Sequence, residues 1–237
     1  MILYIRCFLL LGISLFSLEG FSQNEMHNID LNCISQKKIR KFIISQKDQN
    51  ITDFSGILSG YNEKEDLSGL FKREFAFIIK ENFDMVWNKY ITVSPAESWN
   101  GRIISFGLLI SKSTGFVMYN KDETFSGLDT SQVLYLNLKF LFGVYNLAVG
   151  LEIIGIDNVN KSISFSYLDE GKAQGLQTIH IVSTKKGYSK IIYRAYYKSN
   201  SAFRDRFLYP FFHHKVIREF HRNMKYIILS NDNKKEY

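Results

Sequence analysis

The sequence has few of the residues that constrain a chain covalently. It contains 2 cysteines and 2 prolines among 237 residues. If an N-terminal leader is removed, one thiol remains, at Cys33, and an internal disulfide is then excluded. The hydrophobic core must therefore supply the stability, and we interpret Cys33 as a small apolar residue.

Motifs that identify common enzymes are also missing. The sequence has no Gly-x-Ser-x-Gly elbow, no phosphate-binding glycine loop, no dinucleotide fingerprint and no His-Glu-x-x-His pair. His213 and His214 precede His221 by a helical rise of roughly 10 to 12 Å, which is too far for two ligands of one ion. We therefore predict neither a metal nor a cofactor. These absences remove the usual ways of recognising an enzyme without excluding one.

Apolar and aromatic residues are plentiful. Hydrophobic residues make up 46% of the chain and aromatic residues 15%, including 20 Phe and 14 Tyr. This composition argues against disorder and favours a core or a cavity lined by rings. The length suits one or two domains, and we favour one domain with an extension. The net charge of +7 also predicts a basic surface.

The first residues, 1–22, have the pattern of a signal peptide. Arg6 supplies the positive start, Cys7 to Phe16 is an apolar run, and small residues at Gly20 and Ser22 suit cleavage after Ser22. The apolar run is shorter than the roughly 20 residues that span a bilayer. We therefore expect an exported protein, periplasmic or secreted, with an uncleaved anchor as the alternative.

A polar extension follows, over residues 23–72. Within it, Ser35 to Gln46 has the spacing of a short amphipathic helix, with Ile39, Phe42 and Ile43 on one face and basic residues around them. A basic amphipathic helix either lies on an anionic membrane or packs its apolar side on the domain. We expect packing on the domain.

A compact domain is predicted over residues 73–229, followed by a polar tail, 230–237. The expected elements are a strand at Glu74–Lys80, a helix at Asn82–Tyr90, and strands at Arg102–Ile110, Gly115–Asn120, Gln132–Phe140, Leu147–Asp157, Ser162–Tyr167, Gly175–Thr184 and Lys190–Lys198. Asn100-Gly101 predicts a tight hairpin turn, because both of its positions require a positive φ.

The last predicted element is a long helix, Ser201 to about Leu229. A break is expected at Pro210, because a proline ring inside a helix removes a hydrogen bond and clashes with the preceding turn. Before it, Phe203, Phe207 and Phe211 form one apolar stripe. After it, the core-facing residues are Phe212, His213, Val216, Ile217, Phe220, Met224 and Ile227, and Tyr209 projects onto the same face.

The opposite side of this helix is predicted to be a solvated cationic edge. It consists of His214, Arg218, His221, Arg222 and Lys225. Such an edge is most often only a charged surface. It also suits an anionic membrane, reached through Arg218, Arg222 and Lys225, or an acidic polysaccharide. The same basic side chains could bind the phosphates of nucleic acid, but export argues against that partner.

The order of these elements predicts an α+β fold. A run of antiparallel strands that ends in a long helix suggests a curved antiparallel sheet closed by its last helix. Such an architecture usually encloses an apolar cavity. In Ser162–Tyr167, apolar residues alternate with three serines, which predicts one inward and one outward face. Ile191, Tyr193, Ala195 and Tyr197 alternate with polar residues in the same way.

Four stretches carry a resemblance to a known superfamily. The opening reads Glu74-Phe-Ala-Phe-Ile-Ile-Lys-Glu-Asn-Phe-Asp-Met-Val-Trp87, and later strands read Ser164-Phe-Ser-Tyr167, Gly175-Leu-Gln-Thr-Ile-His-Ile181 and Tyr193-Arg-Ala-Tyr-Tyr197. With the terminal helix, they resemble the START-like helix-grip (SRPBCC) superfamily, and within it an uncharacterised family of small proteins. The resemblance spans Arg73 to Leu229.

The resemblance implies a helix-grip fold with a hydrophobic cavity between sheet and terminal helix. No catalytic residue carries over, because helix-grip proteins include carriers, receptors, cyclases and hydrolases without a shared active site. The leader and the polar extension depart from the superfamily pattern and put a cytoplasmic role in doubt.

Seven residues are the candidates for contact with a ligand. A buried phenol normally requires a hydrogen-bond partner, so tyrosines can hold a ligand head group. His213 lies on the apolar side of the helix, where burial would shift its pKa; the simpler reading is a core imidazole bonded to a carbonyl. The candidates are Phe165, Tyr167, Tyr193, Tyr197, Tyr209, His213 and Phe220.

Three functions remain open at this stage. A noncatalytic binder or carrier of a lipid-like or aromatic molecule requires a large cavity with few polar groups. A cyclase- or hydrolase-type enzyme with His213 as general acid or base requires that histidine to reach a tyrosine or an aspartate in the cavity. An envelope protein that binds other proteins requires a filled core.

Overall fold

The computed structural model describes residues 24–61, 66–140, 143–169, 171, 173–199, 201, 205–206 and 209–230. The predicted leader, 1–22, and residues 231–237 of the predicted tail lie outside these residues, whereas Ser230 ends a helix. Within them, eight strands form one antiparallel sheet in the order β1-β8-β7-β6-β5-β4-β2-β3. The strands are β1 (Phe71–Ile79), β2 (Ile104–Ser111), β3 (Val117–Tyr119), β4 (Gln132–Phe140), β5 (Tyr145–Asp157), β6 (Ser162–Tyr167), β7 (Ala173–Ser183) and β8 (Ser189–Ser199).

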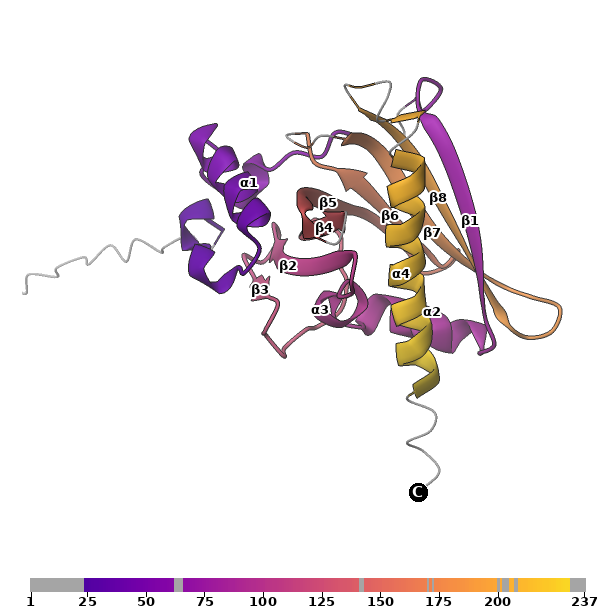
Figure 1. Ribbon diagram of the computed structural model, residues 1–237. Coiled ribbons are helices and arrows are strands. Elements are labelled where there is room, and N and C mark those ends of the chain that lie inside the picture. Colours follow the sequence, from indigo (N-terminus) through magenta and orange to yellow (C-terminus); the bar gives the residue numbers. More distant parts are fainter. Residues whose placement is uncertain are drawn as a thin grey trace, which may run out of the picture.

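The sheet curves around one long helix, α4 (Tyr209–Ser230), as Figure 1 shows. Two changes of register help the sheet to bend. They lie between Phe106 and Leu108 in β2 and between Ile153 and Gly155 in β5. A β-bulge of this kind bends its strand and increases the local twist. The predicted curved antiparallel sheet with a closing helix is confirmed.

Two shorter helices connect β1 to β2. Helix α2 (Phe83–Thr92) begins after Asn82, whose side chain accepts hydrogen bonds from the first-turn backbone, and α3 (Pro95–Ser98) is capped in the same way by Ser94. Val86, Trp87 and Tyr90 are buried against the main core. The helix predicted at Asn82–Tyr90 is therefore confirmed.

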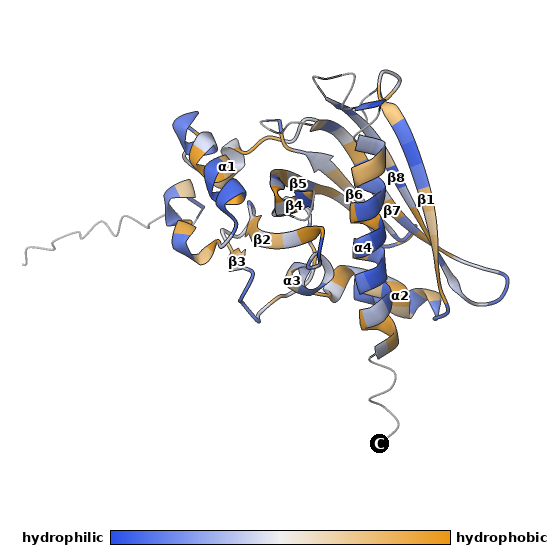
Figure 2. Ribbon diagram, in the orientation of Figure 1, coloured by the Kyte–Doolittle hydropathy of each residue, from blue (hydrophilic) through white to orange (hydrophobic). Residues whose placement is uncertain are grey.

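Helix α4 starts close to the predicted break. Pro210 is its second residue, and a proline is well accommodated in the first turn, where its missing N–H would have no partner. Phe203 and Phe207 lie outside the described residues, and Phe211 is exposed. Both α1 and α4 carry hydrophobic and hydrophilic residues, as expected of amphipathic helices (Figure 2).

The predicted hairpin turn at Asn100-Gly101 is wrong. These residues connect α3 to β2, so only one strand adjoins them, and neither has a positive φ. The glycine is required for a different reason. A Cβ at Gly101 would lie 2.4 Å from the carboxyl carbon of Glu219 on α4. Close approach of a distant side chain, and not turn geometry, explains this glycine.

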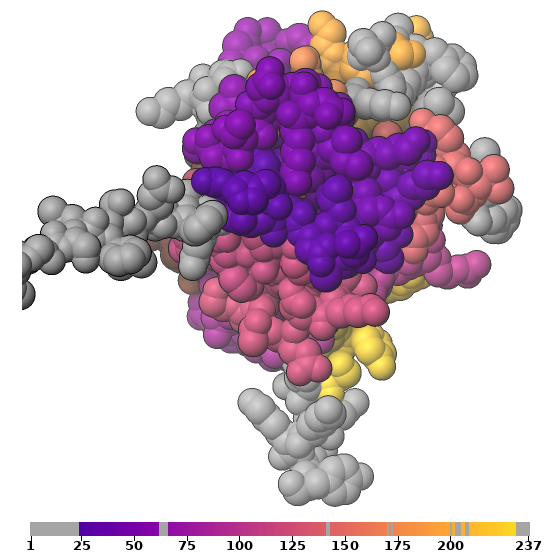
Figure 3. Space-filling view, turned by 90° about the vertical axis from the view of Figure 1, so that its left-hand side faces the viewer, coloured from indigo at the N-terminus to yellow at the C-terminus, as the bar shows by residue number. Residues whose placement is uncertain are grey.

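Residues 24–61 cover the outer face of the sheet. They contain η1 (Met26–Asn28), η2 (Leu31–Cys33), α1 (Lys37–Asp48) and η3 (Phe54–Gly56), and they spread over this side of the molecule in Figure 3 (indigo to violet). Ile39 and Ile43 are fully buried there against Leu108 and Tyr135. The Tyr135 hydroxyl donates to Gln46 at 2.8 Å. Helix α1 thus packs on the domain, as expected.

This outer layer changes the expected faces of β6. The serines predicted to face solvent include Ser164 and Ser166, and both are buried. The Ser166 hydroxyl accepts a hydrogen bond from the backbone N–H of Tyr61 at 3.0 Å. The alternation itself holds, but chain segments cover both faces. In the described part of the chain, no helix is both long enough and apolar enough to cross a membrane.

Candidate functional site

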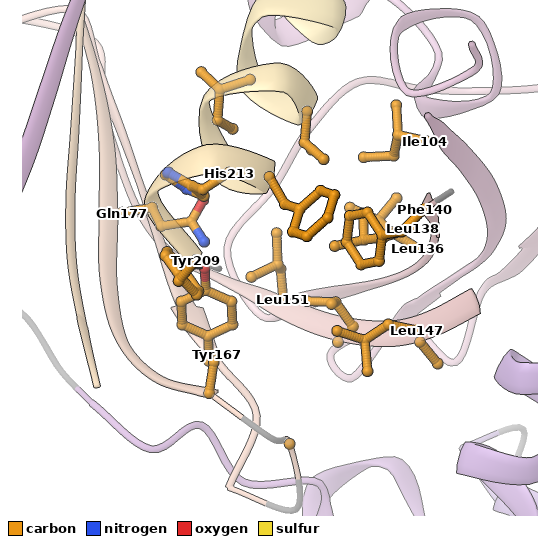
Figure 4. A pocket seen from close by; sticks show the side chains of 18 of the residues that line it. Ile104, Leu136, Leu138, Phe140, Leu147, Leu151, Tyr167, Gln177, Tyr209 and His213 are labelled. Carbon is orange, nitrogen blue, oxygen red and sulfur yellow. Dashed lines mark hydrogen bonds between the residues drawn. The ribbon is translucent and has the colours of Figure 1, made fainter. Parts of the chain in front are cut away.

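A cavity of about 450 Å³ lies between α4 and the sheet. This volume is within the range of small-molecule pockets. The strand wall of the cavity follows from alternation, because Leu136, Leu138 and Phe140 on β4 face inward at every second position. Helix α4 contributes Val216 and Ile217 to the facing wall. Figure 4 shows these leucines, with Phe140, on one side of the cavity.

Aromatic side chains form part of the cavity wall, and one of them, Tyr145, also reaches solvent. Tyr145, at the start of β5, lines the cavity although 49% of it is exposed. Its ring stacks on Phe140 at 6.1 Å, and Phe140 in turn contacts Phe212 of α4 at 4.2 Å. An apolar molecule can therefore reach the interior along apolar surface.

Polar side chains gather on the opposite wall, where Tyr167, Tyr209, Gln177 and His213 lie together (Figure 4). The hydroxyls of Tyr209 and Tyr167 bond to each other, and Tyr167 lies beside the side-chain amide of Gln177. The Tyr193 hydroxyl donates to Gln177 Oε1, and it contacts Nε2 of His213 at 3.0 Å. The hydrogen bonds thus form a pair, Tyr167 with Tyr209, beside a group of three, Gln177, Tyr193 and His213, and these five residues make up the polar network.

The network is uncharged near neutral pH. Burial raises the pKa of Tyr167 and of Tyr193. Burial, with smaller contributions from His214 and Arg73, lowers the pKa of His213 to about 3. The Tyr193 hydroxyl donates its hydrogen bond to Gln177, so its oxygen can only accept from His213. The ring hydrogen of His213 is therefore assigned to Nε2. Nδ1 has no partner within the described residues.

The structure brings three of the seven candidates to the cavity wall: Tyr167, Tyr209 and His213. Two more lie directly behind them. Tyr193 bonds His213, and the ring of Tyr197 stacks on Tyr209 at 3.7 Å. These two tyrosines position the wall and do not line the cavity. Ligand contact by any of these residues stays a prediction.

The other two candidates lie elsewhere. Phe165 and Phe220 border a separate space of about 10 Å³, which is at the lower limit for one water molecule. Phe220 stacks on Trp99 at 3.9 Å, and it is Trp99 that lines the large cavity. The structure therefore places these two phenylalanines in packed core.

Sequence reasoning missed two parts of the cavity. Gln177 was not singled out, because the inward face of β7 was ambiguous; the buried amide is visible only once Tyr193 and Tyr167 are placed beside it. The apolar wall was also missed as a site. Its signal was available in the alternation of Leu136, Leu138 and Phe140.

The assignment of His221 to the predicted cationic edge is wrong, because this residue is buried. Only 2% of it is exposed, and its Nδ1 lies 2.8 Å from the Tyr90 hydroxyl. Its ring stacks on Phe77 of β1 at 4.2 Å. Burial lowers its pKa to about 3, so the ring is neutral. A helical projection places His221 outside because it considers one helix alone. In the structure, β1 and α2 cover that side of α4.

The rest of the predicted edge is exposed. Arg218, Arg222 and Lys225 reach solvent on α4, and Arg222 also bonds Glu219 at 3.3 Å. Cys33 is likewise exposed, and its thiol donates to Asp30 at 3.3 Å. In the described residues, no cluster of three or more His, Cys, Asp or Glu side chains is placed to hold a metal ion.

A buried carboxylate joins α4 to the sheet beside the cavity. Glu219 is 4% exposed. It accepts hydrogen bonds from the backbone N–H groups of Arg102, Ile103 and Ile104 at 2.9, 2.7 and 3.0 Å. Ile104 lines the cavity, so this contact determines how α4 stands relative to β2. Sequence reasoning did not single out Glu219; the available signal was a carboxylate next to the apolar residues Ile217 and Phe220.

The curved sheet, the closing helix and the cavity between them define a helix-grip fold, and solved structures with this fold match the chain. Norcoclaurine synthase of Thalictrum flavum, in complex with a transition-state analogue, matches with a TM-score of 0.51 and 13% identity over 69% of this chain and 96% of that chain. A second structure of that synthase, with dopamine and hydroxybenzaldehyde, has a TM-score of 0.50 and 14% identity over 73% and 95%.

Major latex-like protein 151 of Panax ginseng has a TM-score of 0.49 and 14% identity over 68% of this chain and 98% of that chain. No protein-family model matched the sequence, and neither did a curated protein. At these identities the matches to norcoclaurine synthase establish the fold alone, and function must be inferred from the site.

Proposed function

We propose that this protein is an exported, noncatalytic binder or carrier that holds a hydrophobic small molecule in the cavity between the sheet and α4. The observation that carries the proposal is the cavity of about 450 Å³ with apolar walls and one uncharged polar wall. A filled core, which the third hypothesis required, is absent from the described part of the chain. The aromatic opening beside Tyr145 supplies a route for such a molecule.

Catalysis by His213 is the second candidate. Its contact with Tyr193 at 3.0 Å gives it a tyrosine partner, but that tyrosine lies behind the cavity wall and meets the requirement stated for an enzyme only in part. Norcoclaurine synthase shares the fold. However, a pKa of about 3 makes this imidazole a weak base and leaves it without an acidic proton at neutral pH. General acid–base catalysis works best when the pKa of the group is near the working pH. The low pKa of His213 therefore favours binding over catalysis.

Native mass spectrometry of the processed protein tests both candidates. The protein mass reports cleavage after Ser22, and extraction identifies any molecule that copurifies. A carrier retains its bound molecule when His213 is replaced by Ala. A substrate that accumulates only in the His213→Ala variant would instead support catalysis, and a protein that never carries or binds a small molecule would refute the carrier.

Filling the cavity is expected to abolish binding while the fold survives. Leu151 is buried and lines the cavity, so Leu151→Trp should occupy the empty space. We expect affinity for a neutral dye such as Nile red to fall at least about tenfold, while the midpoint of thermal unfolding is kept or raised by the new contacts.

Two further variants control this experiment. Val159→Trp adds the same ring at an exposed position in the β5–β6 turn, and it should leave dye binding unchanged. Leu138→Trp fills the cavity from β4 and should reproduce the loss. Unchanged dye binding in both cavity variants, each still folded, would contradict the proposed site.

We also propose that the exposed cations of α4 contact an anionic membrane. The support is the exposure of Arg218, Arg222 and Lys225 along one helix and the attraction of basic side chains to anionic lipid. Sedimentation with phosphatidylcholine vesicles, with or without phosphatidylglycerol, checks this. Binding should require phosphatidylglycerol, weaken with salt, and fall at least about tenfold in the variant Arg218→Glu/Lys225→Glu. Equal sedimentation of the two proteins would exclude the surface.

A further inference from the structure

We propose that the cavity selects an uncharged amphiphile, an apolar body with a terminal hydroxyl, over the carboxylate or the ammonium of the same body. This inference rests on the proposed binding function and adds the chemical class of the ligand. It comes from the charges around the cavity. No Lys, Arg, Asp or Glu is found among the described residues that line it.

The charged groups near the polar wall are unsuited to neutralise a ligand. Arg73 and His214, which act electrostatically on His213, are both exposed to water. Asp205 is buried close to the wall, and its carboxylate accepts the backbone N–H of Ser199 at 3.0 Å, but it does not line the cavity. A charged head group would therefore lose its hydration without gaining a counter-charge among the described residues, and this is costly.

A hydroxyl matches the polar wall. The wall presents two tyrosine hydroxyls and the amide of Gln177, which both donate and accept hydrogen bonds, as a hydroxyl does. Tyr167, Tyr209, Gln177 and His213 lie together on one side, with Leu147 and Phe140 opposite (Figure 4). The ligand is thus oriented with its hydroxyl toward Tyr167 and Gln177 and its apolar body along β4 and β5.

Competition among three probes of equal chain length tests this inference. Displacement of Nile red is measured with 1-dodecanol, dodecanoate and dodecylamine at about pH 8, where the acid and the amine are charged. We expect the alcohol to bind at least about tenfold more tightly than either ion. Equal or tighter binding of dodecanoate or dodecylamine would overturn the inference and leave the proposed function intact. No binding of dye or of any probe would overturn the proposed function itself.

Variants at Gln177 separate head-group recognition from damage to the fold. Gln177→Leu should lower the affinity for 1-dodecanol about fivefold and leave the affinity for dodecanoate unchanged, because only the hydroxyl loses a hydrogen-bond partner. Gln177→Lys should shift the preference toward dodecanoate by supplying the missing charge. Thr178→Val, the next residue on β7, should change neither affinity. If Gln177→Leu weakens all probes equally, or Gln177→Lys leaves the order of affinities unchanged, the polar wall does not select the head group.

Discussion

Replacement of Glu219 by Ala is expected to lower the free energy of unfolding by about 3 to 5 kcal/mol. The carboxylate is buried and accepts three backbone N–H groups, from Arg102, Ile103 and Ile104. Alanine would leave these donors buried without partners, and an unmade buried hydrogen bond costs more than a made one contributes. Urea unfolding of the variant and of the natural protein gives the difference.

Two substitutions make this experiment specific. Glu97→Ala removes an exposed carboxylate from α3 and should change the free energy of unfolding by less than about 1 kcal/mol. Gly101→Ala would force the new Cβ toward the Glu219 carboxylate, so it should destabilise the natural protein more than it destabilises the Glu219→Ala variant. Equal stability of the natural protein and Glu219→Ala would show that this contact does not hold α4.

Acidification is expected to destabilise the protein between about pH 6.5 and 3. Burial lowers the pKa of both His213 and His221 from 6.5 to about 3 in the folded state. Below pH 6.5 the unfolded chain binds protons at these rings and the folded chain does not, so their contribution to stability is complete above 6.5 and is lost as the pH falls. Each histidine should cost about 1 kcal/mol per pH unit.

The slope of stability against pH identifies the responsible groups. It should be measured by urea unfolding from about pH 6.5 to 5, above the usual range of carboxyl groups. His221→Phe keeps an aromatic ring next to Phe77 and removes the titrating group, so the slope should fall by about half. His213→Phe should do the same. Slopes that stay unchanged in both variants would show that these rings are not the source of the acid sensitivity.

Much of the fold was predictable because burial imposes local periodicity on a sequence. Tyr193 and Tyr197 alternate with polar residues in β8 as predicted, since each strand has one face toward the core. The helix after Asn82 was predictable for a similar reason. Asn100-Gly101 misled because a turn pattern is local, whereas the partner that requires Gly101 is a side chain of α4, far away in the sequence.

The candidate site was predictable only in part. Tyr167, Tyr209 and His213 reach the cavity wall, but Phe165 and Phe220 have the same apolar pattern and lie in packed core. Periodicity distinguishes buried faces from exposed ones. It does not distinguish a buried side chain that borders empty space from one that touches other side chains.

The amino-acid sequence by itself determined the order of the strands, the closing helix and the apolar character of their inner faces, because these follow from the spacing of residues close together in the chain. Only the tertiary structure decided that space remains under α4 and that its polar wall is neutral. That space depends on contacts between distant residues, such as Glu219 with the start of β2. The neutrality of the wall depends on how deeply His213 and its partners are removed from water.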